Sequence, residues 1–170
     1  QHAWSWCTVA ENLKFGMINV EQSYCKMASI IEKRALSGQS WPEYTELQNL
    51  KTRFSLDKQI VTIPSLTSGL GNLAISGDGQ VNLKEQTYNV LIKANLKGDR
   101  TSEAGCPIKS KSIRNKDLPL RCSGSFAPDG STRCLPEKGF ITQLLKETVK
   151  EKLINNLLNS KSDAGAENSE

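Results

Sequence analysis

The chain has 170 residues, a formal net charge of +4 and 37% hydrophobic residues. This length is typical of one domain that is large enough to bury a core. A nucleic-acid-binding surface needs Lys and Arg clustered on one face, whereas here they are interleaved with Ser, Asn and Glu, so we predict no nucleic-acid partner. No apolar run in the sequence approaches the roughly 18 residues that span a bilayer.

The sequence begins at Gln1 and shows no signal-peptide pattern. A processed protein or a fragment of a longer protein would explain this, and we expect a fragment, because Trp4 and Cys7 already resemble the middle of a domain. We expect residues 1–160 to form a single domain. The tail, residues 161–170, is rich in Ser, Ala, Gly and Glu and is predicted to be disordered.

The cysteines are the best indication of the cell compartment. No two of them have the C-x-x-C spacing of a zinc site, and the single histidine, His2, cannot complete one, so no metal is predicted. Disulfides fit better and predict an oxidising compartment, such as the bacterial periplasm, the secretory lumen or the cell exterior. The alternative is a reduced cytosolic protein with buried thiols. The odd number leaves at least one thiol without a partner in this chain; the five are Cys7, Cys25, Cys106, Cys122 and Cys134.

The first predicted elements are a strand and a helix. Residues 12–18 alternate between apolar and other side chains, which is typical of a strand. Asn19 is a suitable N-cap, with Gln22 three residues later, and apolar residues then recur every three or four positions, so we predict a helix over about residues 20–36. Cys25 lies beside this apolar stripe, either as an isolated buried thiol or as half of a disulfide.

Alternating apolar and polar residues between positions 50 and 126 predict a sheet. The connections are mostly short, so consecutive strands are expected to form a twisted antiparallel meander with one apolar and one polar face. Pro64 indicates a bulge or an edge position, and residues 77–79 are either a turn or a bulge in a longer strand. The predicted strands are residues 50–56, 59–66, 73–83, 88–96 and 118–126, and the predicted turns are residues 57–58, 67–69 and 84–86.

A polar segment, residues 97–117, separates the last two predicted strands and carries six basic residues. Loops of this length inside a domain are often tied down or functional. Cys106 is a candidate tie, and a patch that binds anions or lipid headgroups is the alternative. Cys122 lies on the apolar face of the last strand and has Cys134 and Cys106 as possible partners, because five cysteines allow fifteen two-bridge pairings.

The last element is an amphipathic helix over about residues 137–159. Its apolar stripe is expected to dock on the sheet or on an element of the parent protein, and the alternatives are a membrane surface or a partner helix. Together these elements predict a β-rich α+β fold, in which a meander sheet is flanked by an N-terminal and a C-terminal helix.

The sequence shows no catalytic constellation. A hydrolytic triad needs a base held against a nucleophile, and the only histidine lies near the terminus. The aspartates occur in turns, where Asp caps the backbone, and the glycine pairs do not precede a helix that would bind phosphate. We therefore predict no enzymatic activity and no cofactor.

Several motifs, taken in chain order, resemble the C-terminal region of the AsmA family. The resemblance covers roughly residues 12–158. Cysteines 25, 106, 122 and 134 are similar to those of cysteine-containing family members, whereas Cys7 lies outside that pattern. The motifs are the capped helix that carries Cys25, the Trp41-Pro42 pair, the Leu50-Lys51-Thr52-Arg53-Phe54 strand, the Gly77-Asp78-Gly79-Gln80-Val81-Asn82-Leu83 strand and the Leu118-Pro119-Leu120-Arg121-Cys122-Ser123-Gly124 strand.

The resemblance implies a periplasmic segment of an inner-membrane-anchored protein of a Gram-negative bacterium. AsmA-like proteins hold a long, bent sheet in the periplasm, and its apolar groove is thought to conduct phospholipids towards the outer membrane. The implied partners are phospholipid acyl chains, the remainder of the parent chain and, through a missing N-terminal anchor, the inner membrane. The disulfide candidates are Cys25, Cys106, Cys122 and Cys134.

The apolar face of the sheet is the expected working surface. Helices can bury this face, or part of it can stay open for acyl chains, in a role in phospholipid transport and outer-membrane assembly. The alternative function is a disulfide-stabilised periplasmic domain that binds another protein through its sheet edge or its C-terminal helix. The lipid-facing candidates are Leu50, Phe54, Leu56, Leu73, Ile75, Val81, Leu83, Tyr88, Val90 and Ile92.

Overall fold

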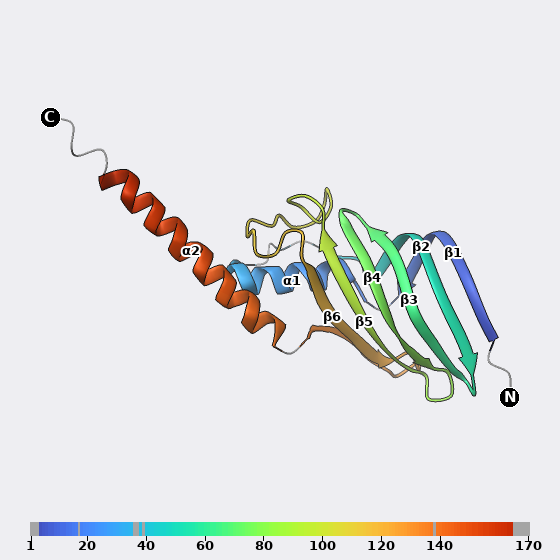
Figure 1. Ribbon diagram of the computed structural model, residues 1–170. Helices are drawn as coiled ribbons and strands as arrows, with labels where there is room; N and C mark the ends of the chain where they lie inside the picture. Colours follow the sequence, from blue (N-terminus) through green and yellow to red (C-terminus); the bar gives the residue numbers. More distant parts are fainter. Residues whose placement is uncertain (1–3, 17, 36–37, 39, 138, 165–170) are drawn as a thin grey trace.

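The computed structural model describes residues 4–16, 18–35, 38, 40–137 and 139–164. They form one sheet and two helices (Figure 1). The described strands form one seven-stranded antiparallel sheet, and their order in space is their order in the sequence. The predicted β-rich α+β meander with two helices is therefore confirmed. In chain order the elements are β1 (Trp4–Gly16), α1 (Val20–Glu32), β2 (Tyr44–Asp57), β3 (Ile60–Leu70), β4 (Leu73–Asn82), β5 (Thr87–Leu96), β6 (Asp117–Ser125), β7 (Thr132–Pro136) and α2 (Phe140–Ala164).

The sheet is wider than the alternation between residues 50 and 126 predicts, because a strand is added at each side. β1 extends well before the predicted strand at 12–18 and pairs with β2 along almost its whole length. β7 pairs with β6, and Cys134 lies opposite Cys122. The interpretation of residues 118–126 as the last strand was therefore wrong.

Two connections differ from the predicted turns. The β2–β3 hairpin turns at Lys58 and Gln59, one residue later than predicted, and their φ angles are 47° and 63°. The turn predicted at residues 67–69 is wrong, because β3 continues through them to Leu70. The chain turns instead at Gly71, where φ is 58° and an added Cβ would meet the backbone of the 97–116 loop.

A bulge in β2 changes which side chains face the core. Asn49 has a φ angle of 52° and lies where the register between β2 and β3 shifts. Before the bulge Thr45 and Leu47 point to the apolar face, and after it Leu50 and Thr52 do so. Because the alternation has period two, one extra residue is enough to exchange the faces.

The central strands confirm one prediction and resolve another. Pro64 lies where β3 shifts its register against both β2 and β4, so the predicted bulge is confirmed. β4 runs through residues 77–79 with no turn and no register shift against β5. These residues therefore belong to a longer strand and form no turn, and the register shift against β3 lies between Gly77 and Gly79.

The core lies between α1 and one end of the sheet, and Figure 1 shows α1 crossing one sheet face. Asn19 caps the helix as predicted, because its Oδ1 accepts a hydrogen bond from the Gln22 N–H at 2.8 Å. The helix ends at Glu32, earlier than the predicted end near residue 36, and Lys33 follows it in a left-handed conformation. The residues buried in this cluster are Val20, Tyr24, Cys25, Met27, Ala28, Ile31, Leu70, Leu73, Ile75, Tyr88, Ala94, Leu96, Cys106, Ile108, Ile113, Leu118, Leu120, Cys122 and Leu144.

The described contacts of the helix α2 with the body lie near its start. Leu144 is buried in the core, whereas Val149 and Leu153 are 47% and 57% exposed, and Figure 1 shows α2 extending away from the sheet. The helix begins later and ends later than the predicted 137–159, so residues 161–164 of the predicted disordered tail are helical; residues 165–170 lie outside the described residues. Within the part that is described, neither helix is long and apolar enough to cross a membrane.

Candidate functional site

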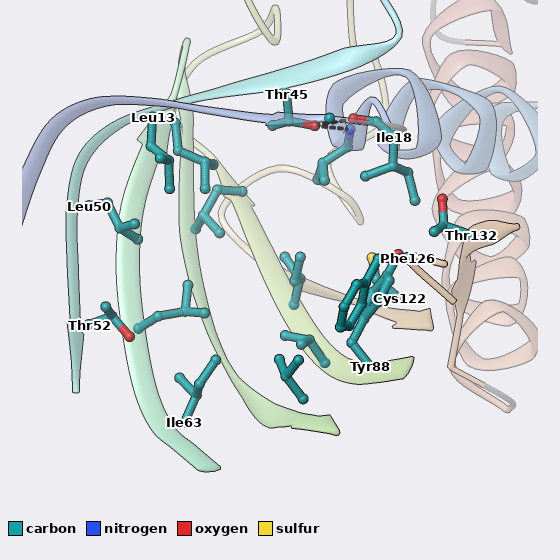
Figure 2. Close-up of a pocket in the computed structure, with 18 residues that line it drawn as sticks. Leu13, Ile18, Thr45, Leu50, Thr52, Ile63, Tyr88, Cys122, Phe126 and Thr132 are labelled. Atoms are coloured by element: carbon teal, nitrogen blue, oxygen red, sulfur yellow. Dashed lines mark hydrogen bonds between the residues drawn. The ribbon is translucent and has the colours of Figure 1, made fainter. Parts of the chain in front are cut away.

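An apolar cavity lies on the sheet face that carries the core, beyond the part that α1 covers (Figure 2). Its volume is about 320 Å³, at the lower end of the range of roughly 300–1,000 Å³ that is typical of ligand pockets. Figure 2 shows Leu50 and Ile63 on one side of this space and Tyr88 and Phe126 on the other. The lining residues are Leu13, Gly16, Ile18, Val20, Thr45, Leu47, Leu50, Thr52, Ile63, Leu66, Ile75, Val81, Tyr88, Val90, Ile92, Cys122, Phe126 and Thr132.

Two glycines of β4 explain why the apolar face is empty at this point. In the register of the sheet, Gly79 lies between Ile63 of β3 and Val90 of β5. Gly77 takes the equivalent position one row further along, opposite Ile92. An added Cβ on Gly79 would lie 2.6 Å from the Cα of Val90. The backbones therefore approach too closely for a side chain, and the middle of the face stays free.

The side of the cavity near α1 is held by Thr45. Its Oγ1 donates a hydrogen bond to the Ile18 carbonyl at 2.7 Å and accepts one from the Val20 N–H at 2.9 Å. The Nδ2 of Asn19 also donates to the Tyr44 carbonyl at 3.0 Å. These bonds tie the start of α1 to β2, and they fix the two apolar side chains, Ile18 and Val20, that line the cavity there.

Tyr88 and Thr132 form the polar part of the opposite side. Both side chains line the cavity, and Tyr88 is 9% exposed. Burial raises the pKa of Tyr88 above its ordinary value, and the Thr132 side chain opposes part of this rise. The phenol is therefore neutral at physiological pH, and it adds no charge to the cavity.

One disulfide lies in the cavity wall. Cys122 and Cys134 are register partners on β6 and β7, with their Cα atoms 4.0 Å apart, and they are bonded to each other. Of the two partners that the sequence left open for Cys122, Cys134 is therefore the observed one. The bond fixes β7, which carries Thr132, beside the strand that carries Cys122.

A second disulfide ties the long loop to α1. Cys25 and Cys106 are bonded, with their Cα atoms 6.0 Å apart and a sequence separation of 81. The prediction that Cys106 ties the loop is therefore confirmed, and Cys25 is half of a disulfide. The side chain of Cys7 lies outside the described part of the structure.

Two carboxylates of α1 hold the same loop. Glu21 accepts hydrogen bonds from the hydroxyls of Thr101 and Ser102 at 2.7 and 2.6 Å. Glu32 accepts backbone N–H bonds from Lys109 and Ser110 at 2.8 and 2.9 Å. The loop is thus fixed to both ends of the helix as well as by the disulfide between them.

The arginines of this loop donate hydrogen bonds to carbonyl groups of the same loop. Arg100 donates to the Gly105 carbonyl at 3.0 Å, and Arg114 donates twice to the Ile108 carbonyl, at 3.0 and 2.6 Å. Lys116 is ion-paired with Glu147 of α2. These contacts use three of the six basic residues that suggested an anion-binding patch, and they favour the tied-down alternative.

Six of the ten predicted lipid-facing residues line the cavity together: Leu50, Ile75, Val81, Tyr88, Val90 and Ile92. The other four do not line it. Phe54 and Leu56 are half-buried further along β2, Leu73 is buried in the core, and Leu83 is 44% exposed after the end of β4.

Several cavity-lining residues could not be predicted from the alternation between positions 50 and 126. They lie outside these positions, or on the part of a strand where the alternation has changed faces. Leu13 belongs to the predicted strand at 12–18, so its alternation was a usable signal. Thr45 and Leu47 lie before the Asn49 bulge, and nothing in the sequence marks that change of phase. Thr132 lies on the missed strand β7.

No group of three or more His, Cys, Asp or Glu side chains within the described ranges could hold a metal ion. The cavity presents hydrocarbon walls and neutral groups, so what it can do chemically is to surround an apolar ligand. The chain matches no protein-family model, no curated protein and no solved structure.

Proposed function

We propose that this chain is a non-enzymatic, AsmA-like segment whose cavity takes an acyl chain of a phospholipid. In this role it contributes an apolar groove to phospholipid transport and outer-membrane assembly in the periplasm of a Gram-negative bacterium. The single observation that carries the proposal is the cavity, because about 320 Å³ of space is lined by uncharged, almost entirely apolar walls.

The physical argument is the cost of leaving such walls in water. Apolar surface gains roughly 25 cal/mol per Å² when it is removed from water, and a cavity that is open to solvent forgoes this gain until a ligand fills it. A hydrocarbon chain removes the walls and its own surface from water together. These walls therefore favour a hydrocarbon occupant, and an acyl chain of a phospholipid is the one that we propose.

The two disulfides support the compartment of the proposal. They are compatible with an oxidising environment, either extracellular or periplasmic. The periplasm is the choice that agrees with the AsmA resemblance.

The test compares two substitutions on neighbouring residues of β5. Val90→Phe places an aromatic ring in the cavity, whereas Leu91→Phe makes a similar change on the opposite sheet face. We expect native mass spectrometry of the purified 170-residue chain to show bound phospholipid in the wild type and in Leu91→Phe, and a loss in Val90→Phe. Thr52→Phe fills the cavity from β2 and is used if Val90→Phe does not fold. A wild-type protein that neither carries nor takes up lipid would overturn the proposal.

A second candidate function is protein binding, and the outer strand β1 favours it. β1 is thirteen residues long and forms one edge of the described sheet, so a strand of the parent chain or of another protein can pair with it. This function predicts that a Pro substitution in the middle of β1 removes a co-purifying protein without changing lipid content.

A further inference from the structure

We infer that the cavity recognises only the hydrocarbon segment of its ligand and is indifferent to the headgroup. This inference rests on the proposed function and names the substrate class more narrowly: any lipid with one free unbranched alkyl chain, whether its head is anionic, zwitterionic or neutral.

The first observation is the absence of charge from the cavity wall. None of the lining residues of the described cavity is Asp, Glu, Lys, Arg or His. The charged residues of the strands that form it lie on the other sheet face: Lys51 and Arg53 are exposed on β2, and Lys93 is exposed on β5. A headgroup phosphate or carboxylate therefore has no ionic partner inside the cavity.

The second observation is that the wall carries few polar groups. Thr45 bonds to the backbone at both sides of the helix start. Thr52 donates to the Ser65 carbonyl at 3.4 Å. Among the lining residues only these two threonines, Tyr88 and Thr132 carry hydroxyl groups, so the ligand meets mainly carbon atoms.

These two observations set the energetic consequences for a ligand. A polar group inside the cavity would lose its hydrogen bonds to water and find few replacements, which weakens binding roughly tenfold or more. A methylene inside the cavity strengthens binding by roughly fourfold, the factor that corresponds to its transfer from water. The headgroup is consequently left in solvent, and its charge has little effect on affinity.

The experiment measures the dissociation constants of four single-chain ligands with the same fourteen-carbon chain. They are tetradecanoic acid, its monoacylglycerol, its lysophosphatidylcholine and its lysophosphatidylglycerol, each used below the concentration at which it forms micelles. Titration calorimetry is done with the full chain at high salt, because a net charge of +4 attracts anionic lipids nonspecifically at low salt. Two further ligands, decanoic acid and 14-hydroxytetradecanoic acid, test chain length and chain polarity.

We expect the four headgroups to agree within about threefold, the shorter chain to bind much more weakly, and the terminal hydroxyl to weaken binding roughly tenfold or more. Val90→Phe should abolish binding of every ligand, and Leu91→Phe should leave all the constants unchanged. Headgroup differences above tenfold at constant chain length, or equal binding of the hydroxylated chain, would overturn this inference and leave the proposed function standing. Binding of no ligand at all would overturn both.

Discussion

Gly79 shows how a single missing side chain shapes the site. An added Cβ there would lie 2.6 Å from the Val90 Cα, which is backbone and cannot move aside. We expect Gly79→Ala to lower the free energy of unfolding by about 1–3 kcal/mol, because β4 and β5 must separate. Urea denaturation measures this, and Gly38→Ala is the control, since nothing lies within 4 Å of an added Cβ there. An equal effect of the two substitutions would show that the close approach is unimportant.

Tyr24 is a residue whose hydroxyl group costs stability. It lies on α1 with its side chain fully buried, and its hydroxyl has no hydrogen-bond partner among the described residues. Removing an unsatisfied buried group is favourable, so Tyr24→Phe is expected to raise the free energy of unfolding at pH 7 by about 1 kcal/mol. Urea denaturation checks this, and Tyr44→Phe, on a more exposed ring, provides the baseline.

Tyr24 also makes the stability of the folded state depend on pH. Burial, with a smaller contribution from Glu32, raises the pKa of Tyr24 above its ordinary value of 10.0. The folded state therefore holds this proton more tightly than the unfolded state, so stability is intact below pH 10 and falls as the pH rises above it. The advantage of Tyr24→Phe over the wild type should consequently grow between pH 8 and pH 11. A constant difference would contradict the raised pKa.

At the residue scale, prediction from sequence succeeded where the period-two alternation is unbroken. Val81, Tyr88, Val90 and Ile92 were predicted to share one face, and they line the cavity. The prediction failed at Phe54, because the cavity lies beside the part of β2 that precedes this residue. It extends across the Asn49 bulge to Thr45 and Leu47. A bulge depends on pairing between strands, which no local pattern contains.

At the scale of elements, the two disulfides are expected to differ in their contribution to stability. Cys25–Cys106 spans 81 residues and Cys122–Cys134 spans 12. Because a longer closed loop removes more entropy from the unfolded chain, replacing the first pair by Ala should cost about 1.7 kcal/mol more than replacing the second. Chemical denaturation of the two double variants measures this difference, and equal losses would contradict it.

Limited proteolysis gives an independent check on the same elements. The 97–116 loop is held by Cys106 and by carboxylates of α1. Loss of the long-range disulfide should expose this loop to cleavage, whereas loss of Cys122–Cys134 should leave it protected.

The elements themselves were predictable to different degrees. β5 was predicted within one residue at its start and at its end, since its alternation is regular and short turns bound it on one side. β7 was missed because five residues after a Pro-Asp-Gly turn carry too short a pattern, and its place is fixed by pairing with β6. The turn at residues 67–69 was a wrong choice between two nearby glycines, of which Gly71 is the one with a positive φ angle.

At the scale of the whole molecule, the meander itself followed from short connections between alternating segments. What the sequence could not show is how far α1 reaches along the apolar face. The helix covers the end that holds Leu73, Leu96 and Leu118, and the remainder of that face forms the cavity. This division depends on where the start of α1 is pinned, which is a contact between Thr45 and Ile18 across 27 positions of the chain.

The pairing of the cysteines also has a consequence for the order in which disulfides form. Cys7 lies 18 positions before Cys25 in the sequence, whereas the native partner of Cys25 follows 81 residues later, after β2 to β5. A bond between Cys7 and Cys25 would have to be exchanged before the native one forms. We expect Cys7→Ser to form the native Cys25–Cys106 bond faster in pulse-alkylation experiments without isomerase, and an unchanged rate would argue against this trap. A faster rate would show that Cys7 competes with Cys106 for Cys25 while the chain folds.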